Sequence, residues 1–413
     1  MARDEARELD LVVWGATGYT GRLLAASLAE AAPPGLRWAL GGRDRERLER
    51  LRDELGLDVA LVEGDARDAA SMARLAARTR VVATTVGPYA RHGDALLAAC
   101  AAAGTHYADL TGEVLWMRRS IDAHHDTARG SGAKLVHACG FESVPSDLGV
   151  WWLQRVAAAR HGHPCGTVVH GFGPMAGGVS GGTVASAMDL VAELTGDPAR
   201  RRALRDPDVL APRAARSAPE RAGVWPRRER DLDGWTAPFF MARVNQAVVR
   251  RTRALLGEPW GPGFRYGERW RARGWAEAAG VGLGTVLVPP MLAIGPLRRF
   301  VERRLPRPGE GPSAEDRARG FFRTALAGRI DGVAGPVVLR IACDLDPGYG
   351  ATALMLREAA LSLALDDLPP GGGVVTPAVA FGDGLVARLQ RAGMRFEVEP
   401  DAPEYGQGVS AEA

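Results

Sequence analysis

Apolar and polar positions alternate with two different periods over the first part of the chain. The run LDLVVW at 9–14 is short, apolar and β-branched, which predicts a buried strand. From Tyr19 to Ala32 leucine and alanine recur every three or four positions, which predicts a helix. The same order repeats in strand-like runs that begin at Leu36, Asp58, Arg80, Thr105 and Ala133. This alternation predicts a Rossmann-type doubly wound parallel sheet over residues 1–150.

Three glycines separate the first expected strand from the first expected helix. Gly15 can form the tight turn, Gly18 can let a pyrophosphate approach the backbone, and Gly21 can let the helix pack closely on the strand. The amide groups and positive dipole end of that helix would then face the phosphates of a dinucleotide. The alternative is a turn that holds no ligand. The residues assigned to this phosphate site are Gly15, Ala16, Thr17, Gly18, Tyr19, Thr20 and Gly21.

The end of the second expected strand distinguishes between the two nicotinamide dinucleotides. NAD-specific sites carry an acidic residue there to hold the ribose 2′-hydroxyl, whereas this chain has Arg43, with Arg45 close by. A guanidinium favours a 2′-phosphate, so we expect NADP(H), unless both arginines only flank a solvated helix start. We place Asp65 near the adenine. The nicotinamide half of the cleft is assigned to Val86, Gly87 and Pro88, with Thr85 and Tyr89 beside them.

Polar residues also follow the fifth and sixth expected strands, in the segments 109–113 and 139–143. Because the carboxyl ends of parallel strands meet at one edge of a sheet, we expect these loops to line one cleft and to supply catalytic groups. The sequence GFESVPS around Ser143 has some likeness to a nucleophile elbow. It lacks the GxSxG pattern, so the sequence argues against a hydrolase.

Composition and charge narrow the function classes. The 413 residues are 46% hydrophobic and 24% charged, which is typical of a folded protein of two domains. The 52 basic and 49 acidic residues leave a net charge of +3, which argues against a nucleic-acid partner. The four cysteines are far apart and the charged N-terminus lacks a signal sequence. We therefore expect a cytoplasmic protein without disulfides and without a metal site.

The segment 278–297 contains no charged residue and is followed by five arginines between 298 and 307. Its length is close to that of a membrane span, but Pro289, Pro290 and several glycines argue against one straight helix. We expect peripheral contact with the cytoplasmic face of the plasma membrane, since arginines beside an apolar stretch suit anionic headgroups. The alternatives are a buried core element or the contact surface of a homodimer.

Seven sequence blocks resemble the saccharopine dehydrogenase-like family, and within it the trans-acting enoyl reductase branch. They are GATGYTGRLLAASL (15–28), TTVGPYARHGDALLAACAAAGTHYADLTGE (84–113), ACGFESVPSDLGV (138–150), SGGTVASAM (180–188), LPRPGEGPS (305–313), DPGYGATALMLREAALSLA (346–364) and GGGVVTPAVAFGDGLVARLQRAGMRFEV (371–398). The resemblance spans almost the whole chain and is weakest between about 195 and 275.

This resemblance implies an α+β substrate domain at 151–375 and a C-terminal segment, 376–413, that returns to the first domain. It also implies NADPH-dependent reduction of an unsaturated acyl thioester, carried on an acyl carrier domain of a polyketide synthase, in lipid or glycolipid biosynthesis. For such a reaction we expect Tyr89 to act as proton donor or carbonyl partner. Asp109 and Glu113 would orient Tyr89 or the cofactor amide, and Tyr349 is the donor candidate from the second domain.

Other patterns in the second half allow two interpretations each. Gly177, Gly178, Gly181 and Gly182 suit either a close substrate approach or a tight hairpin. Asp346 stands in an Asp-Pro-Gly sequence that more often only forms a turn. Residues 199–274 show no clear period, and we expect a long excursion over the cleft.

Two further functions remain open at this point. A saccharopine-type amino-acid dehydrogenase would need convergent arginines for a substrate with several carboxylates. A membrane-associated protein could also bind NADP(H) without catalysing a reaction, since a bound nucleotide is not in itself a reaction.

Overall fold

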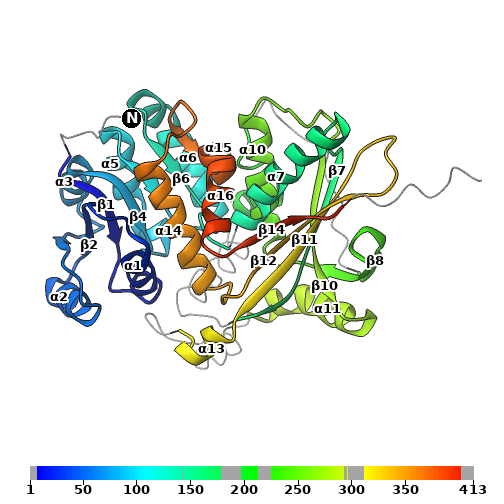
Figure 1. Cartoon of the computed structure of the whole chain (residues 1–413), viewed down its shortest axis with the longest axis horizontal. Helices are drawn as coiled ribbons and strands as arrows, with labels where there is room; N and C mark the ends of the chain where they lie inside the picture. Colours follow the sequence, from blue (N-terminus) through cyan, green and yellow to red (C-terminus); the bar gives the residue numbers. More distant parts are fainter. Residues whose placement is uncertain are drawn as a thin grey trace, which may run out of the picture.

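The computed structural model describes residues 7–141, 143–177, 197–212, 225–292, 295 and 311–400. Within these residues the strands form two sheets of seven strands each, which lie beside one another with helices packed between and around them (Figure 1).

The first sheet has the order β13-β6-β5-β4-β1-β2-β3, and all of its strand pairs are parallel. Its strands are β1 (Leu9–Trp14), β2 (Trp38–Gly42), β3 (Ala60–Glu63), β4 (Thr79–Thr84), β5 (His106–Ala108), β6 (Lys134–Val136) and β13 (Gly373–Val375). All six residues of β1 are buried, as expected for a central strand covered on both faces. The Rossmann-type sheet predicted from the sequence is confirmed.

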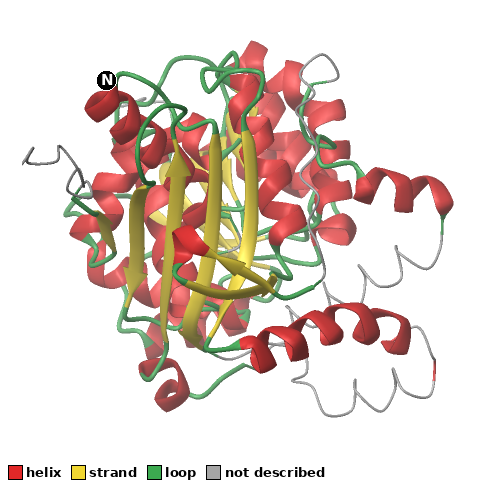
Figure 2. Cartoon of the chain, turned by 90° about the vertical axis from the view of Figure 1, so that its right-hand side faces the viewer, coloured by secondary structure: helices red, strands yellow, loops and turns green. Residues whose placement is uncertain are grey.

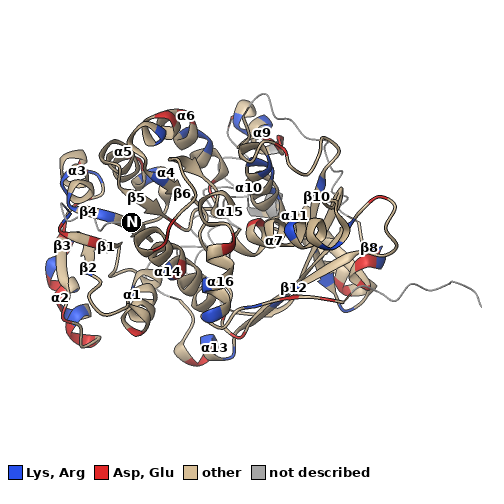
Figure 3. Cartoon of the chain, turned by 45° about the horizontal axis from the view of Figure 1, so that its top comes forward, with Lys and Arg blue, Asp and Glu red and all other residues tan. Residues whose placement is uncertain are grey.

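Helices cover both faces of this sheet. They are α1 (Tyr19–Ala31), α2 (Arg45–Glu54), α3 (Ala69–Arg78), α4 (Tyr89–His92), α5 (Asp94–Ala103), α6 (Val114–Ser131) and α14 (Gly350–Leu365). Asp44 caps α2 by accepting a hydrogen bond from the Arg47 amide, and Asp68 caps α3 in the same way. Helix α2 carries closely spaced acidic and basic residues at the outer edge of the molecule (Figure 3), whereas α14 packs against α1 and β4 and is buried almost throughout.

The second sheet is mixed and has the order β14-β12-β11-β7-β10-β9-β8. Its strands are β7 (Thr167–Ala176), β8 (Arg227–Glu229), β9 (Gly234–Pro238), β10 (Arg265–Ala272), β11 (Phe321–Arg329), β12 (Val337–Cys343) and β14 (Arg395–Val398). Only β7 and β10 pair in parallel; the other described pairs of this sheet are antiparallel. Figure 2 shows this sheet in front of most of the helices.

The remaining helices flank the second sheet or join it to the first. They are α7 (Val144–His161), α9 (Pro198–Arg205), the 3-10 helix η1 (Arg230–Leu232), α10 (Ala242–Leu255), α11 (Trp275–Leu292), α13 (Ala314–Ala318), α15 (Pro377–Phe381) and α16 (Asp383–Arg391). Helix α7 follows β6 directly and packs on β11 and β12. A Cβ atom at Gly149 would lie 2.9 Å from Ile341 Cδ1, so this glycine permits the close approach of α7 to the second sheet.

Two segments are arranged differently from the sequence-based expectation. The chain already reaches the first sheet through α14 and β13, at residues 350–375; α15 and α16 then pack against β6 and α14, and β14 pairs with β12 in the second sheet. Residues 199–274 are also more regular than expected, because β8, β9 and β10 extend the second sheet and α10 packs on α7.

Candidate active site

The glycine-rich loop has the geometry of a phosphate-binding turn. Gly15 follows β1 with φ +84°, and its amide donates to the Gly41 carbonyl at 2.9 Å. Gly18 is the N-cap of α1 and supplies no side chain to the helix start. The amides of the first helical turn therefore have no side-chain cap and no acceptor within the helix, which leaves them directed at the space where phosphates would bind.

The close packing of this turn explains its other glycines. A Cβ atom at Gly21 would lie 2.1 Å from the Gly15 carbonyl oxygen, and one at Gly15 would lie 2.6 Å from Val86 Cγ2. Side chains at these positions would push α1 away from the turn or force the loop after β4 to move. The turn thus fits the dinucleotide pyrophosphate predicted from the sequence, with Ala16, Thr17, Tyr19 and Thr20 completing it.

Cationic groups gather where the adenosine end of a dinucleotide would lie. Arg43 is exposed directly after β2, and Arg47 from the first turn of α2 reaches back to the Thr17 carbonyl at 3.4 Å. Burial, together with the charges of Arg67, Arg91 and Arg43, lowers the pKa of His92, so these three arginines all lie within electrostatic range of His92. Such a cluster suits the 2′-phosphate of NADP(H).

Asp65 lies exposed in the turn after β3, at the same edge of the sheet. Its carboxylate accepts a hydrogen bond from the Arg67 amide at 2.9 Å and so shapes the turn that presents the Arg67 side chain. The charge of Asp65 favours a higher pKa of His92 and so opposes the effect of the neighbouring arginines.

The loop after β4 lies against the glycine-rich turn. Thr85 donates from its hydroxyl to the Gly15 carbonyl at 3.3 Å, and its amide donates to the Trp14 carbonyl at 3.0 Å. Val86 and Pro88 are half-buried and Gly87 is exposed. The residues predicted for the nicotinamide half of the cleft therefore stand beside the phosphate turn.

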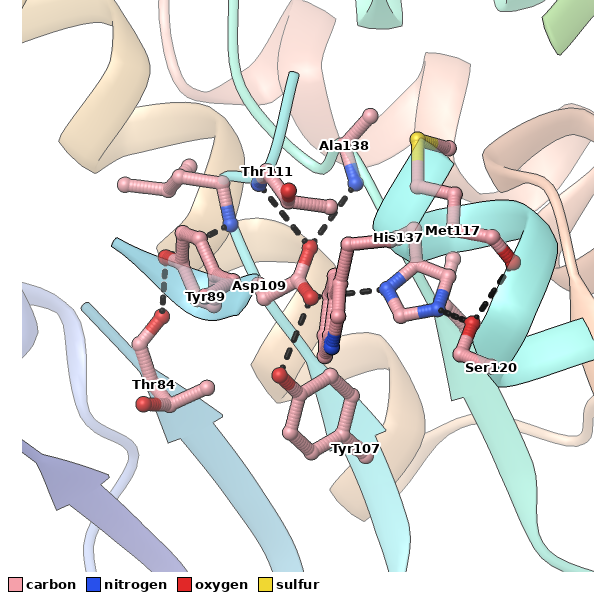
Figure 4. Close-up of polar contacts among 12 residues, drawn as sticks. Thr84, Tyr89, Tyr107, Asp109, Thr111, Met117, Ser120, His137 and Ala138 are labelled. Carbon is pink, nitrogen blue, oxygen red and sulfur yellow. Dashed lines mark hydrogen bonds and ion pairs between the residues drawn. The ribbon is translucent and has the colours of Figure 1, made fainter. Parts of the chain in front are cut away.

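Asp109, at the end of β5, is the centre of a buried polar network (Figure 4). It is fully buried, and one carboxylate oxygen accepts from His137 Nδ1 at 2.7 Å and from the Tyr107 hydroxyl at 2.9 Å. The other oxygen accepts from the amides of Thr111 and Ala138, both at 3.0 Å. Through these bonds Asp109 holds the loops after β5 and β6 together. The bond to Ala138 stabilises a residue with φ +59°, which is an unfavourable conformation for alanine.

The network ends at Ser120 of α6, whose hydroxyl lies 2.7 Å from His137 Nε2. The order Ser120–His137–Asp109 is that of a catalytic triad, but Ser120 is 3% exposed and also donates to the Met117 carbonyl at 2.8 Å. A buried serine cannot reach a substrate carbonyl. The network therefore supports the loops and does not provide a nucleophile.

Tyr89 and Glu113 likewise make structural contacts within the loops of the site. The Tyr89 hydroxyl donates to the Thr84 carbonyl at 3.1 Å and accepts from the Leu110 amide at 3.2 Å, and its ring stacks on Trp116. The Glu113 carboxylate accepts from the amides of Tyr89 and Ala90, both at 2.8 Å. These contacts fix the loop after β4 to the loop after β5.

Tyr349 lies on the phosphate side of the site, away from the loops just described. It is 2% exposed at the N-terminus of α14, where its amide donates to Asp346 at 2.8 Å. Its ring meets the ring of Tyr19 edge to face, with centroids 5.0 Å apart. Arg317 donates to the Tyr19 hydroxyl at 2.7 Å, and that hydroxyl donates to the Pro312 carbonyl at 2.5 Å.

An apolar wall adjoins the loops that follow β5 and β6, at the junction with the second sheet. It consists of Phe141, Phe172, Met175, Phe239, Met241 and Trp270. Phe172 and Phe239 are buried and stack with centroids 4.0 Å apart, whereas Phe141, Met175, Met241 and Trp270 are only partly buried. Met241 also approaches Gly112 in the loop after β5. The apolar wall therefore meets the loops where the nicotinamide half of a dinucleotide would lie.

A second buried network joins the β6 loop to the second sheet. The Ser143 hydroxyl donates to Asn245 Oδ1 at 2.9 Å, and Asn245 Nδ2 donates to Glu268 at 3.0 Å. Glu268 also accepts from Ser146 and Tyr266, both at 2.6 Å. Burial raises the pKa of Glu268 to about 7 even though these hydrogen bonds favour its charged form.

Several sequence-based candidates lie outside the described residues, and one set of contacts was not anticipated. Glu142, Gly178, Gly181 and Gly182 are not among the described positions, whereas Gly177 packs against Asp346. The sequence did not indicate Arg47 or Arg317. Arg47 stands four residues after Arg43, which is the only sequence signal that could have suggested it.

Comparisons with known proteins agree with this geometry. Residues 11–136 match the family described as Saccharopine dehydrogenase NADP binding domain. The chain is 39% identical over 414 residues to the trans-acting enoyl reductase of Mycobacterium leprae, covering 94% of this chain and 97% of that protein. A Mycobacterium tuberculosis relative is 41% identical over 424 residues, covering 95% of this chain and 97% of the relative. Among solved structures, apo saccharopine dehydrogenase (L-Glu forming) from Saccharomyces cerevisiae matches with a TM-score of 0.51 at 10% identity, covering 94% of this chain and 99% of that chain, which shows a shared fold.

Proposed function

The chain belongs to the family of trans-acting enoyl reductases, NADP-dependent oxidoreductases, and on that premise we propose that it reduces an α,β-unsaturated acyl thioester. We propose further that the acyl group is carried on an acyl carrier domain of a polyketide synthase, in the biosynthesis of a lipid or glycolipid. The word "trans-acting" in the names of the relatives supports a substrate held by a separate protein.

The single observation that carries this proposal is the apolar wall beside the loops after β5 and β6. A substrate with several carboxylates would need cationic groups at this position. The six described side chains of the wall are instead aromatic rings and thioethers, which bind an acyl chain by removing its apolar surface from water. The wall therefore supports an acyl substrate over saccharopine.

In the proposed reaction the β-carbon of the acyl group would accept the hydride that bound NADPH supplies, and the α-carbon would take up a proton. The glycine-rich turn binds the pyrophosphate, and Arg43 with Arg47 favours the 2′-phosphate. The apolar wall orients the acyl chain and excludes water from the reacting carbons.

We propose that three of the four candidate catalytic residues act by positioning. Tyr89, Asp109 and Glu113 each direct their polar atoms at backbone or buried side-chain groups. Through these bonds they hold the loops after β4, β5 and β6 in one arrangement. Tyr349 packs against Tyr19 of the phosphate turn, so we propose that it supports cofactor binding.

A chain-length series tests the proposal. Purified protein is mixed with NADPH and enoyl thioesters of increasing acyl length, and NADPH oxidation is followed by absorbance; saturated thioesters serve as controls. We expect turnover that improves with acyl length, because longer chains cover more of the wall. Turnover of saccharopine with NADP⁺, but of no enoyl thioester, would contradict the proposal, and so would tight NADPH binding without turnover of either substrate.

A further inference from the structure

Helix α11 presents an apolar surface that the proposed reaction does not use. From Ala278 to Leu292 its sequence contains no charged residue. The side chains of Leu283, Val286, Leu287, Val288 and Met291 are between 45% and 60% exposed. Large apolar side chains that are exposed together in this way mark a surface that binds a partner or a membrane.

At residues 285–288 the exposed surface extends around the helix. Residues 285–288 are four consecutive exposed positions, and consecutive residues of an α-helix point about 100° apart. Nearer its N-terminus α11 packs on β9 and β10, and Ala278 and Gly282 are buried there. A docked folded protein, or a second copy of this chain, would cover one side of the helix. A lipid interface can surround it, and this favours a membrane as the occupant.

The charges next to α11 indicate which kind of membrane. Trp275, at the start of the helix, is exposed, and an aromatic ring at this place suits the headgroup region; the neighbouring Arg273 is exposed and pairs with Glu277. Beyond the helix the sequence contains five arginines and one glutamate between 298 and 307. Net positive charge beside an apolar helix selects anionic lipid. Among the described residues no helix has the length and hydropathy of a membrane span.

We propose that α11 inserts into the headgroup region of an anionic bilayer and holds the protein at the membrane surface. The helix is also linked to the apolar wall, because Trp270 of that wall donates from its indole nitrogen to Glu277 of α11 at 3.2 Å. The membrane contact itself does not rest on the proposed reaction.

Vesicle sedimentation tests this proposal with a matched pair of variants. Leu287 in α11 is 45% exposed and Leu365, the last residue of α14, is 43% exposed, so L287E and L365E add the same charge at equally exposed leucines. The full-length protein is mixed with vesicles of phosphatidylcholine, with or without phosphatidylglycerol. NADPH affinity is measured for each variant to show that it is folded.

We expect the wild type and L365E to sediment with the phosphatidylglycerol vesicles and less with pure phosphatidylcholine. L287E should reduce the bound fraction at least about fivefold while NADPH affinity is unchanged. Equal binding by the two variants, or no vesicle binding by the wild type, would overturn the proposal. Light scattering provides the other arm: a wild-type dimer that L287E converts to a monomer, without any change in vesicle binding, would assign this surface to a second copy.

Discussion

The rings of Tyr19 and Tyr349 meet edge to face, with their planes at 90° and their centroids 5.0 Å apart. Tyr19 is the first residue of the helix whose amides face the phosphate site, and Tyr349 precedes α14, the helix that returns from the second sheet to the first. This contact connects the geometry of the phosphate turn with the position of the chain that crosses between the sheets. Gly311 also packs against the Tyr19 ring, so a third segment meets the other two at this point.

Arg317 is expected to contribute to cofactor binding through Tyr19. R317A removes the bonds to the Tyr19 hydroxyl and the Pro312 carbonyl, at 2.7 Å and 2.9 Å. Loss of about 1 kcal/mol should weaken NADPH binding by about fivefold, as measured by fluorescence titration. R319A is the matched control, because Arg319 is exposed and pairs with Glu315 on its own helical turn, away from Tyr19. Equal affinities of R317A and R319A would contradict this role.

Arg43 should determine the preference for NADPH over NADH. In R43A the 2′-phosphate loses a charge-assisted partner, so the Kd for NADPH should rise by about 10- to 100-fold. The Kd for NADH should change by less than about threefold, since NADH lacks that phosphate. R45A serves as control, because Arg45 pairs with Glu49 along α2 at 3.0 Å. Parallel losses for NADPH and NADH in R43A would place the 2′-phosphate elsewhere.

Tyr89 should prove a positioning residue. Y89F keeps the stacking on Trp116 but removes the hydroxyl that contacts the Thr84 carbonyl and the Leu110 amide. We expect Tm to fall, because the part-buried Leu110 amide loses its acceptor at a cost of about 1 kcal/mol, whereas turnover should fall by less than about tenfold. A loss of turnover of about a hundredfold or more with unchanged Tm, together with an altered pH–rate profile, would instead identify Tyr89 as the proton donor.

Glu268 should make stability depend on pH. Its folded pKa is raised to about 7 from 4.5 by burial, so the folded state favours the protonated carboxyl. The resulting stabilisation is complete below the unfolded pKa and is lost as pH rises through about 7, a change of about 3 kcal/mol in the free energy of unfolding. E268Q should reduce this loss between pH 5 and pH 8 in urea unfolding.

The exposed Glu315 provides the control for that experiment, since E315Q should keep the wild-type pH profile. Burial also raises the pKa of Asp147 to about 7. In E268Q the free energy of unfolding should therefore still fall as pH rises, but with a smaller slope than in the wild type. Identical pH profiles for E268Q and the wild type would show that Glu268 is charged in the folded protein throughout this range.

The first sheet and the phosphate turn could be predicted because their signals are local. A buried run, three glycines and an amphipathic helix are adjacent in the sequence. Strand β13 could not be found in this way, because it has three residues and enters the sheet from far along the chain. A Cβ atom at Gly372 would lie 2.3 Å from the Ala128 carbonyl oxygen, a constraint that appears only once β13 lies beside β6.

The roles of the candidate site residues depend on contacts between distant segments. The sequence places Asp109 correctly at the end of its strand, but its partner His137 lies 28 residues further along, so the buried network is not evident from sequence. The sequence also shows that the α11 segment is uncharged, and only the structure shows that residues 285–288 are exposed. Sequence spacing can thus identify which loops meet, but not which of their side chains are buried beneath the surface of the site.

The most direct test of the central claim follows the hydride itself. NADPH carrying deuterium at the transferred position of the nicotinamide is incubated with the protein and a medium-chain enoyl thioester, and the product is analysed by mass spectrometry. The account predicts one deuterium at the β-carbon of the saturated acyl chain. A product without deuterium, or deuterium transfer only to a 2-oxo acid in the presence of an amino acid, would contradict it.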